Sequence, residues 1–261
     1  MALPDLLGPY DDLLRRTFQI RAVLAVTEAM VKSPTVITTS RKVDLTKVGA
    51  ETTNTVTAMS LVFLASSFEE FVREEITQCS GYMSERYPKL TDQTKHGVRN
   101  AYWNVSLDRL RLNRSILTKT TPKLPDMAVV TKVRKLVDSI QGFVINDNSS
   151  LLENSVFCHH ANNFRPHVVD EIANRLGITG LLGKAADSGK LRAYFGVTTK
   201  AAAAEKLNSK LTEFYDRRNE IVHSLSGSAG YAVDVILDYA DLIEATAESI
   251  RNVLSRELTA W

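Results

Sequence analysis

The stretch Phe214-Tyr-Asp-Arg-Arg-Asn-Glu-Ile-Val-His223 decides the fold, because it places a charged residue within an otherwise apolar helical stripe. Apolar side chains recur around it at three- and four-residue steps, at Leu207, Leu211, Phe214, Val222 and Leu225. Arg218 falls in the seam that they define. An unpaired buried charge costs several kcal/mol or more. A carboxylate, a phosphate or a water-filled cleft must therefore hold this guanidinium.

Helical periodicity dominates the rest of the chain, which is interrupted by only seven prolines and twelve glycines. The sequence therefore predicts a mainly α fold. We expect helices at about 10–32, 51–86, 92–112, 126–140, 167–176, 198–224 and 231–258. A short extended element is expected at 35–39, where β-branched residues follow Ser33-Pro34.

The length of 261 residues and the 44% hydrophobic content allow the chain to bury a substantial core. We expect a single helical domain over 1–261. Within it, the range 141–196 is rich in Asn, Gly and Ser and has a looser pattern, which predicts a loop-rich insertion.

The charge and the cysteines limit the class of protein. Thirty-two basic and thirty acidic residues give a net charge of +2, so no global field draws the protein to nucleic acid or to a membrane. Cys79 and Cys158 form no disulfide framework, which fits a reducing cytoplasm. The apolar runs are shorter than the roughly 20 residues that span a bilayer, and no signal peptide is indicated. His159, His160 and His167 lack further ligands at helical spacing, so we expect neither metal nor cofactor.

Arg218 and His223 combine an anion-binding group with a group that titrates near neutral pH. Attack of an RNA 2′-hydroxyl on the adjacent phosphate needs a base, an acid and positive charge on the phosphorane, and it needs no metal. On a regular helix these two side chains point about 140° apart. A second copy of the chain would bring two such pairs into one cleft. Asn219 is placed to donate to a phosphate oxygen or to fix the histidine tautomer.

A purely structural interpretation stands beside this one. The helix at 51–86 carries Glu69 at the border of its apolar stripe and Glu75 within it. Either carboxylate is a candidate partner for Arg218. Arg and His near a helix C-terminus also suit the negative end of its dipole.

Further cations are candidates for contacts with a nucleic acid. Arg217 precedes Arg218, and the run Arg109-Leu-Arg-Leu-Asn-Arg114 follows the aromatic pair Tyr102-Trp103. The residues expected to contact RNA are Arg217, Arg111, Arg114 and Lys119. The basic section continues through Lys132, Arg134 and Lys135. A solvated helix face is the more common explanation of such a basic run.

Arg218-Asn-Glu-Ile-Val-His223 resembles the R-x(4–6)-H signature of the HEPN superfamily, in which Asn or Asp often follows the Arg. Two further stretches, Ser66-Ser-Phe-Glu-Glu-Phe-Val-Arg73 and 160–178, are similar to the larger prokaryotic RiboL-PSP-associated HEPN proteins. The likeness covers about residues 50–255, and the Arg-His segment is its specific part.

The resemblance implies a HEPN-like helical bundle that forms a homodimer and acts as a metal-independent endoribonuclease, often in toxin or antiphage defence systems. Arg218 and His223 carry over as catalytic residues, with Asn219 in support and Glu69 as the acidic residue that orients the arginine. RNA is the implied substrate, and an antitoxin or sensor protein is an open further partner. The alternative is a catalytically silent HEPN module that binds RNA or a partner protein.

Overall fold

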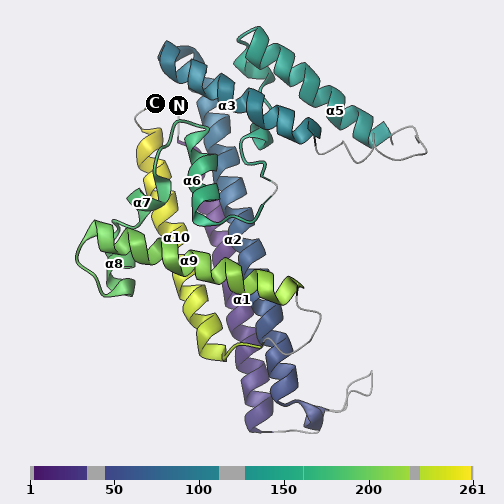
Figure 1. Ribbon diagram of the computed structural model, residues 1–261, viewed down its shortest axis with the longest axis vertical. Coiled ribbons are helices and arrows are strands. Elements are labelled where there is room, and N and C mark those ends of the chain that lie inside the picture. Colours follow the sequence, from purple (N-terminus) through teal and green to yellow (C-terminus); the bar gives the residue numbers. More distant parts are fainter. Residues whose placement is uncertain (1–2, 34–44, 112–126, 161, 224–229, 260) are drawn as a thin grey trace. The chain divides into compact units, whose positions relative to one another are not determined.

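The computed structural model describes residues 3–33, 45–111, 127–160, 162–223, 230–259 and 261. The described residues are mainly α-helical and include no strand, which confirms the predicted fold class (Figure 1). The extended element expected at 35–39 lies outside the described residues.

The chain divides into two compact units, and two long helices and one short helix contribute to both. Unit 1 consists of residues 1–6, 72–181 and 252–261, and unit 2 consists of residues 7–71 and 182–251. The boundary falls within α2 (Ala50–Arg86) and within α10 (Val233–Leu258). The expectation of a single domain with an insertion at 141–196 stays a prediction.

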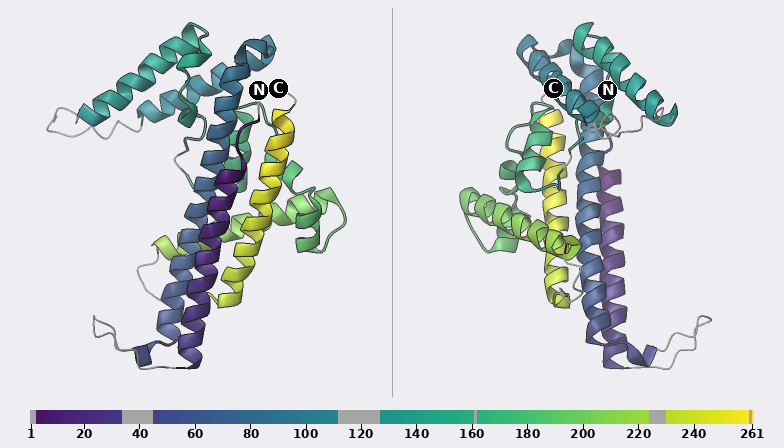
Figure 2. Two further views of the ribbon diagram at one scale, coloured as in Figure 1. Left: turned by 180° about the vertical axis from the view of Figure 1, so that it is seen from behind. Right: turned by 45° about the vertical axis from the view of Figure 1, so that its right-hand side comes forward.

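Unit 2 is built on the long helix α1 (Leu7–Lys32) and the parts of α2 and α10 that belong to it. Polar contacts tie α1 to α10: the Tyr10 hydroxyl donates to Glu248 at 3.4 Å, and Arg21 donates to Asp241 at 2.8 Å. Residue numbers rise along one helix as they fall along the other, so the two helices are antiparallel. In both views of Figure 2, α1 also lies beside the first part of α2.

The remaining elements of unit 2 are short, except for α9. They are η1 (Leu45–Lys47), α7 (Leu181–Ala185), whose first residue falls in unit 1, α8 (Gly189–Phe195) and α9 (Lys200–His223). The helix α9 crosses α10 (Figures 1 and 2), and the rings of Phe214 and Tyr239 lie 5.1 Å apart at the contact. Both side chains are fully buried, which fixes α9 on the core of the unit.

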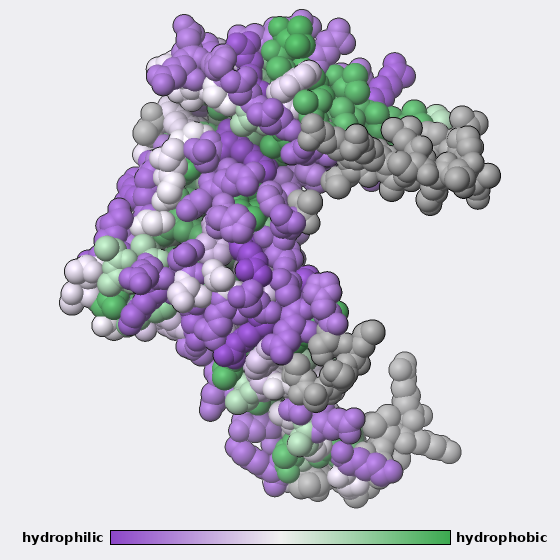
Figure 3. Space-filling view, in the orientation of Figure 1, coloured by the Kyte–Doolittle hydropathy of each residue, from purple (hydrophilic) through white to green (hydrophobic). Residues whose placement is uncertain are grey.

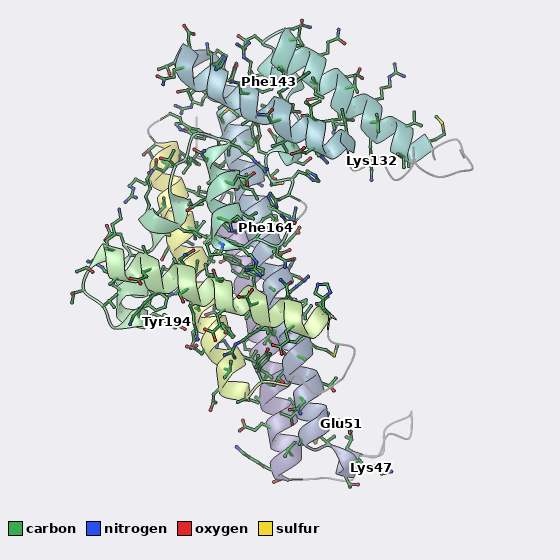
Figure 4. The ribbon with its side chains drawn as sticks, viewed as in Figure 1. Lys47, Glu51, Lys132, Phe143, Phe164 and Tyr194 are labelled. Atoms are coloured by element: carbon green, nitrogen blue, oxygen red, sulfur yellow. The ribbon has the colours of Figure 1, made fainter. Side chains whose placement is uncertain are left out.

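Unit 1 holds the second half of α2 and a series of shorter helices. In chain order these are η2 (Tyr87–Lys89), α3 (Asp92–Arg111), α5 (Met127–Ser139), the π-helical η3 (Ile140–Ile145), η4 (Ser149–Leu151), η5 (Asn154–Val156) and α6 (Pro166–Asn174). Their core is aromatic, because Phe143 lies 5.2 Å from Tyr87 and 5.1 Å from Tyr102 in edge-to-face contacts (Phe143 is labelled in Figure 4).

The observed helix ends lie within a few residues of the predicted ones, which is the usual precision for boundaries. The helix α1 begins three residues earlier than expected, at Leu7, because Pro9 is compatible with a first helical turn. The helix α6 ends before Gly177, whose φ of 83° is left-handed.

One helical stretch, Ala50–Lys89, is long and apolar enough to cross a membrane by length and composition, although the sequence predicts no span. Half of its most apolar window is buried inside the protein. Buried core helices of soluble proteins share these properties, so the observation is weak support for a membrane location.

Candidate functional site

The helix α9 carries the Arg-His segment, and its buried row shows how Arg218 is placed. Ala203, Leu207, Leu211, Phe214 and Tyr215 are buried along one side of the helix. Arg218 comes next in this row and is partly buried, as the sequence predicts. The expectation that Val222 continues the apolar seam is wrong, because its side chain is 46% exposed. The burial of α9 thus ends one turn before the helix does.

The guanidinium of Arg218 is only partly satisfied by the protein. Its Nη1 atom donates to the Oδ1 atom of Asn219 at 3.2 Å. Its Nε atom is buried and finds no acceptor among the described residues. A buried donor without an acceptor costs about 1–3 kcal/mol, more for a charged group. An anionic ligand would remove this cost.

His223 is the last residue of α9, and its side chain is exposed. The helix runs without interruption from Arg218 to His223, so the two side chains leave it roughly 140° apart. A helix that ended earlier would have let the imidazole swing toward Arg218, but the described residues show no such break. Within one chain, these two groups therefore do not converge. The residues that follow, 224–229, lie outside the described part.

The two carboxylates expected near Arg218 differ in their surroundings. Glu69 is partly buried and lies on the part of α2 that belongs to unit 2. The whole of α9 belongs to the same unit. Glu75 lies on the part of α2 in unit 1 and is fully buried, as its place inside the apolar stripe predicts. The role of Glu69 as the acidic residue that orients Arg218 stays a prediction.

Arg217, expected to contact RNA, lies in a cluster that holds the end of α9. It donates to Glu213, one turn earlier, at 2.6 Å. Its guanidinium also lies 4.9 Å from the ring centre of Tyr231 and 5.7 Å from that of Tyr239. These contacts compete with a contact to substrate, and the substrate role of Arg217 stays a prediction.

Tyr231 is the residue that sequence reasoning missed, although an aromatic side chain directly after a segment rich in Gly and Ser is a usable signal. Its hydroxyl donates to Glu220 on α9 at 3.0 Å, and burial, followed by this hydrogen bond to the carboxylate, raises the pKa of the hydroxyl. Because Tyr231 precedes α10, it joins the start of α10 to the last turns of α9. Contacts between residues on either side of 224–229 therefore hold the last turns of α9, which end at His223, against Tyr231.

Gly230 makes a second close contact beside Tyr231. A Cβ atom added to Gly230 would lie 2.3 Å from the Cβ atom of Asn54 on α2. No other residue type fits this position without a shift of the chain. Close packing against α2 thus requires a glycine at this position.

The other expected RNA contacts fall where the structure gives no side-chain positions. Arg111 ends α3, but its side chain, like Arg114 and Lys119, lies outside the described part. Within the described ranges, no three His, Cys, Asp or Glu side chains gather as a set of metal ligands. The expectation that the site works without metal or cofactor stays a prediction.

Comparison with known proteins gives one match. The family model RiboL-PSP-HEPN matches residues 39–256, which include α2, α9 and nearly all of α10. No curated protein and no solved structure matches the chain. HEPN families are generally endoribonucleases, so the match indicates an RNase-like or RNA-related function. Because the match covers most of its length, the chain belongs to the RiboL-PSP-HEPN family.

Proposed function

We propose that the protein is a metal-independent endoribonuclease that cleaves RNA through attack of the 2′-hydroxyl on the adjacent phosphate. The observation that carries the proposal is the buried Nε atom of Arg218, which has no acceptor among the described residues. A guanidinium held in this state is suited to a phosphate oxygen, because paired N–H groups match phosphate geometry. Family membership supports the same chemistry.

Three residues of the segment and Glu69 have roles in this reaction. Arg218 stabilises the negative charge that builds on the phosphorane. His223 takes the proton of the 2′-hydroxyl or gives one to the 5′-oxygen that leaves. Asn219 accepts a hydrogen bond from Arg218 and orients it. Glu69 is the carboxylate proposed to fix the arginine from α2. The products are a 2′,3′-cyclic phosphate and a free 5′-hydroxyl.

The active form is a homodimer. Arg218 and His223 diverge on one helix by roughly 140°, so a second copy is needed to bring an imidazole next to a guanidinium. Unit 2 offers an apolar surface for such a contact. Phe18 and Val26 on α1 are 64% and 59% exposed, and Met59 and Phe63 on α2 are 67% and 48% exposed. Large apolar side chains that are exposed on neighbouring helices are candidates for a protein interface.

We propose that the protein acts in the cytoplasm as a toxin or an antiphage effector. An antitoxin or a sensor protein restrains it until it is needed. Expression of the wild-type chain in a bacterium is expected to arrest growth and fragment RNA, and the His223→Ala chain is expected to do neither.

The purified protein provides the direct test. It should cleave total RNA in EDTA and leave 2′,3′-cyclic phosphate ends, and both Arg218→Ala and His223→Ala should remove this activity. Helicity and dimer mass should remain unchanged in the variants. A silent HEPN module would bind RNA and leave it intact, and full activity of pure His223→Ala protein would reject the proposed chemistry.

A mixing experiment tests the shared site. When Arg218→Ala and His223→Ala proteins are unfolded together and refolded, mixed dimers hold one intact Arg218 and one intact His223. If these come together across the dimer, the mixture regains part of the activity. Mixtures that stay inactive, although mass spectrometry shows mixed dimers, would exclude this shared arrangement.

A further inference from the structure

A groove in unit 1 lies apart from the Arg-His segment in the sequence and carries excess positive charge. It has a volume of about 390 Å³ and is formed by the end of α3, by α5 and by the residues around η5. Its described charged residues are Arg109, Lys132, Lys135 and Glu153, three cations and one carboxylate. The groove therefore has a net charge of +2. Figure 4 labels Lys132 on α5.

The contacts in the groove leave two of its cations available. Lys135 pairs with Glu153, which also accepts a hydrogen bond from Ser155 at 3.1 Å. Arg109 donates to the Ser155 hydroxyl at 3.4 Å. Neither Arg109 nor Lys132 forms an ion pair with any residue that the structure describes. Glu153 feels the charge of Arg109 as well as that of Lys135, but the three cations outnumber this one carboxylate, and the excess positive charge attracts an anion.

The floor of the groove is apolar and firmly held. Leu136 is buried, and Leu110, Val129 and Val133 line the space between the two helices. Beneath them, the Tyr102 hydroxyl contacts Ser139 at 2.5 Å and accepts from the backbone N–H of Glu153 at 3.1 Å. This network fixes α3, α5 and the chain before η5 relative to one another. The cations therefore stand on a preformed surface.

The positive field extends beyond the groove. Burial, followed by the charges of Arg109, Arg175 and Arg73, lowers the pKa of His159 to about 4. The first of these arginines lines the groove. A second hollow, of about 690 Å³, adjoins it and shares Lys135, Glu153 and Ser155. The groove and this hollow together form a surface that is longer than one phosphate group.

We propose that the groove between α3 and α5 binds the phosphate backbone of single-stranded RNA through Arg109 and Lys132, at a site separate from the Arg-His segment. The choice of RNA rests on the proposed function. The structure favours a contact with the RNA backbone because the walls of the groove supply cations. Base stacking needs aromatic side chains, and the described residues that line the groove include none. Such a site holds the strand without selecting its sequence.

The test measures binding of a fluorescent single-stranded RNA by anisotropy at several salt concentrations, in EDTA and with His223→Ala protein so that the strand stays intact. Each phosphate contact contributes about 0.7 to the slope of log affinity against log salt for a single strand. Replacement of both cations, Arg109→Gln with Lys132→Gln, is expected to raise Kd and to reduce the slope by about 1.4.

A matched control removes two cations elsewhere. Lys32 is 70% exposed at the end of α1, and Lys200 is exposed at the start of α9. Lys32→Gln with Lys200→Gln lowers the net charge equally and is expected to leave the slope unchanged. Glu153→Gln releases Lys135 and is expected to tighten binding. If the double groove variant folds poorly, Lys132→Gln alone should reduce the slope by about 0.7, because this exposed lysine has no described partner to lose.

The outcomes separate this proposal from the proposed nuclease function. An equal slope in the groove variant and the control, no RNA binding by the parent protein, or equal binding of polyglutamate would each overturn the groove site. Loss of binding in the groove variant alone supports it. If the wild-type protein binds RNA through the groove but never cleaves it, the nuclease proposal fails and the groove proposal stands.

Discussion

The Nη1 atom of Arg218 donates a hydrogen bond to the Oδ1 atom of Asn219, its neighbour on α9, at 3.2 Å. This contact uses one side of the guanidinium and leaves the buried Nε atom without an acceptor in the described residues. The preceding residue, Arg217, has the opposite character, because it is paired with Glu213. Adjacent arginines on one helix thus differ in their contacts: Arg217 is ion-paired, and Arg218 has a donor atom without an acceptor among the described residues.

We expect Arg218→Lys to retain little of the RNA cleavage and Arg218→Ala to retain none. A lysine keeps the charge but loses the paired N–H groups, and loss of one oxyanion-stabilising donor typically costs about 10²–10³-fold in rate. Cleavage rates of a labelled RNA in EDTA measure the effect. Circular dichroism should be unchanged, and a lysine variant with the wild-type rate would show that charge alone is sufficient.

Gly230→Ala is expected to destabilise the protein by about 1–3 kcal/mol, because the new Cβ atom would overlap the Cβ atom of Asn54. It should also slow RNA cleavage, since the shift would reach His223 through Tyr231. Urea unfolding measures the first effect and the cleavage rate measures the second. Gly97→Ala is the control. Its Cβ would meet nothing within 4 Å, and alanine in a helix is favoured by up to about 1 kcal/mol. Equal effects at both glycines would contradict this packing argument.

The stability of the protein is expected to fall as the pH drops from about 6.5 toward 4, in part because of His159. In the folded state, the pKa of this imidazole is lowered from its ordinary value of 6.5 to about 4. Burial is the main cause, followed by the positive charges of Arg109, Arg175 and Arg73. Between pH 6.5 and about 4, the imidazole is therefore protonated in the unfolded chain but remains neutral in the folded chain. This difference favours unfolding as the pH falls. Thermal melting at a series of pH values measures the effect. His159→Gln should flatten the profile in this interval, and an unchanged profile would rule out His159 as a cause.

Arg175→Ala is expected to cost about 2–4 kcal/mol of stability. The side chain is only 9% exposed, and its Nη1 atom donates to the carbonyl oxygens of Phe157 and His159, each at 2.7 Å. Its removal would leave two carbonyl groups without this donor, at about 1–3 kcal/mol each where they are buried. Chemical denaturation gives the free energy of unfolding.

Arg134→Ala is the matched control for Arg175. Arg134 is 83% exposed and lies 4.0 Å from Asp138, so its loss should cost less than about 0.5 kcal/mol. If the two arginine variants were equally stable, the contacts of Arg175 would contribute nothing to the fold.

Surface hydropathy separates the two candidate RNA sites. Figure 3 shows mainly hydrophilic side chains over α9, whereas hydrophobic side chains gather over α5. Those on α5 include Met127, which is 73% exposed, and Val137, which is 46% exposed. The cations of the groove share its lining with apolar residues such as Val129 and Val133, whereas the side chains seen over α9 are mainly hydrophilic. In the groove, ionic contacts are therefore less well solvated and stronger than on an open polar face.

Local pattern alone determined most of the helical architecture. The helices at 7–32, 50–86 and 200–223 lie within three residues of their predicted ends, since apolar periodicity, prolines and glycines act within a few turns. The same pattern placed Arg218 on the buried side of α9 and Glu75 inside the core of α2, and both are observed there.

Only the tertiary structure decided which side chains are engaged and which are available. In the tertiary structure, Val222 is exposed and Arg217 contacts Glu213 and Tyr231. The helices α3 and α5 together form a groove. These outcomes depend on contacts between residues that are distant in sequence, and periodicity carries no information about which helices meet. The residue types show that the chain contains arginines suited to phosphate. Packing determines that Arg217 pairs with Glu213 and that the Nε atom of Arg218 has no acceptor among the described residues.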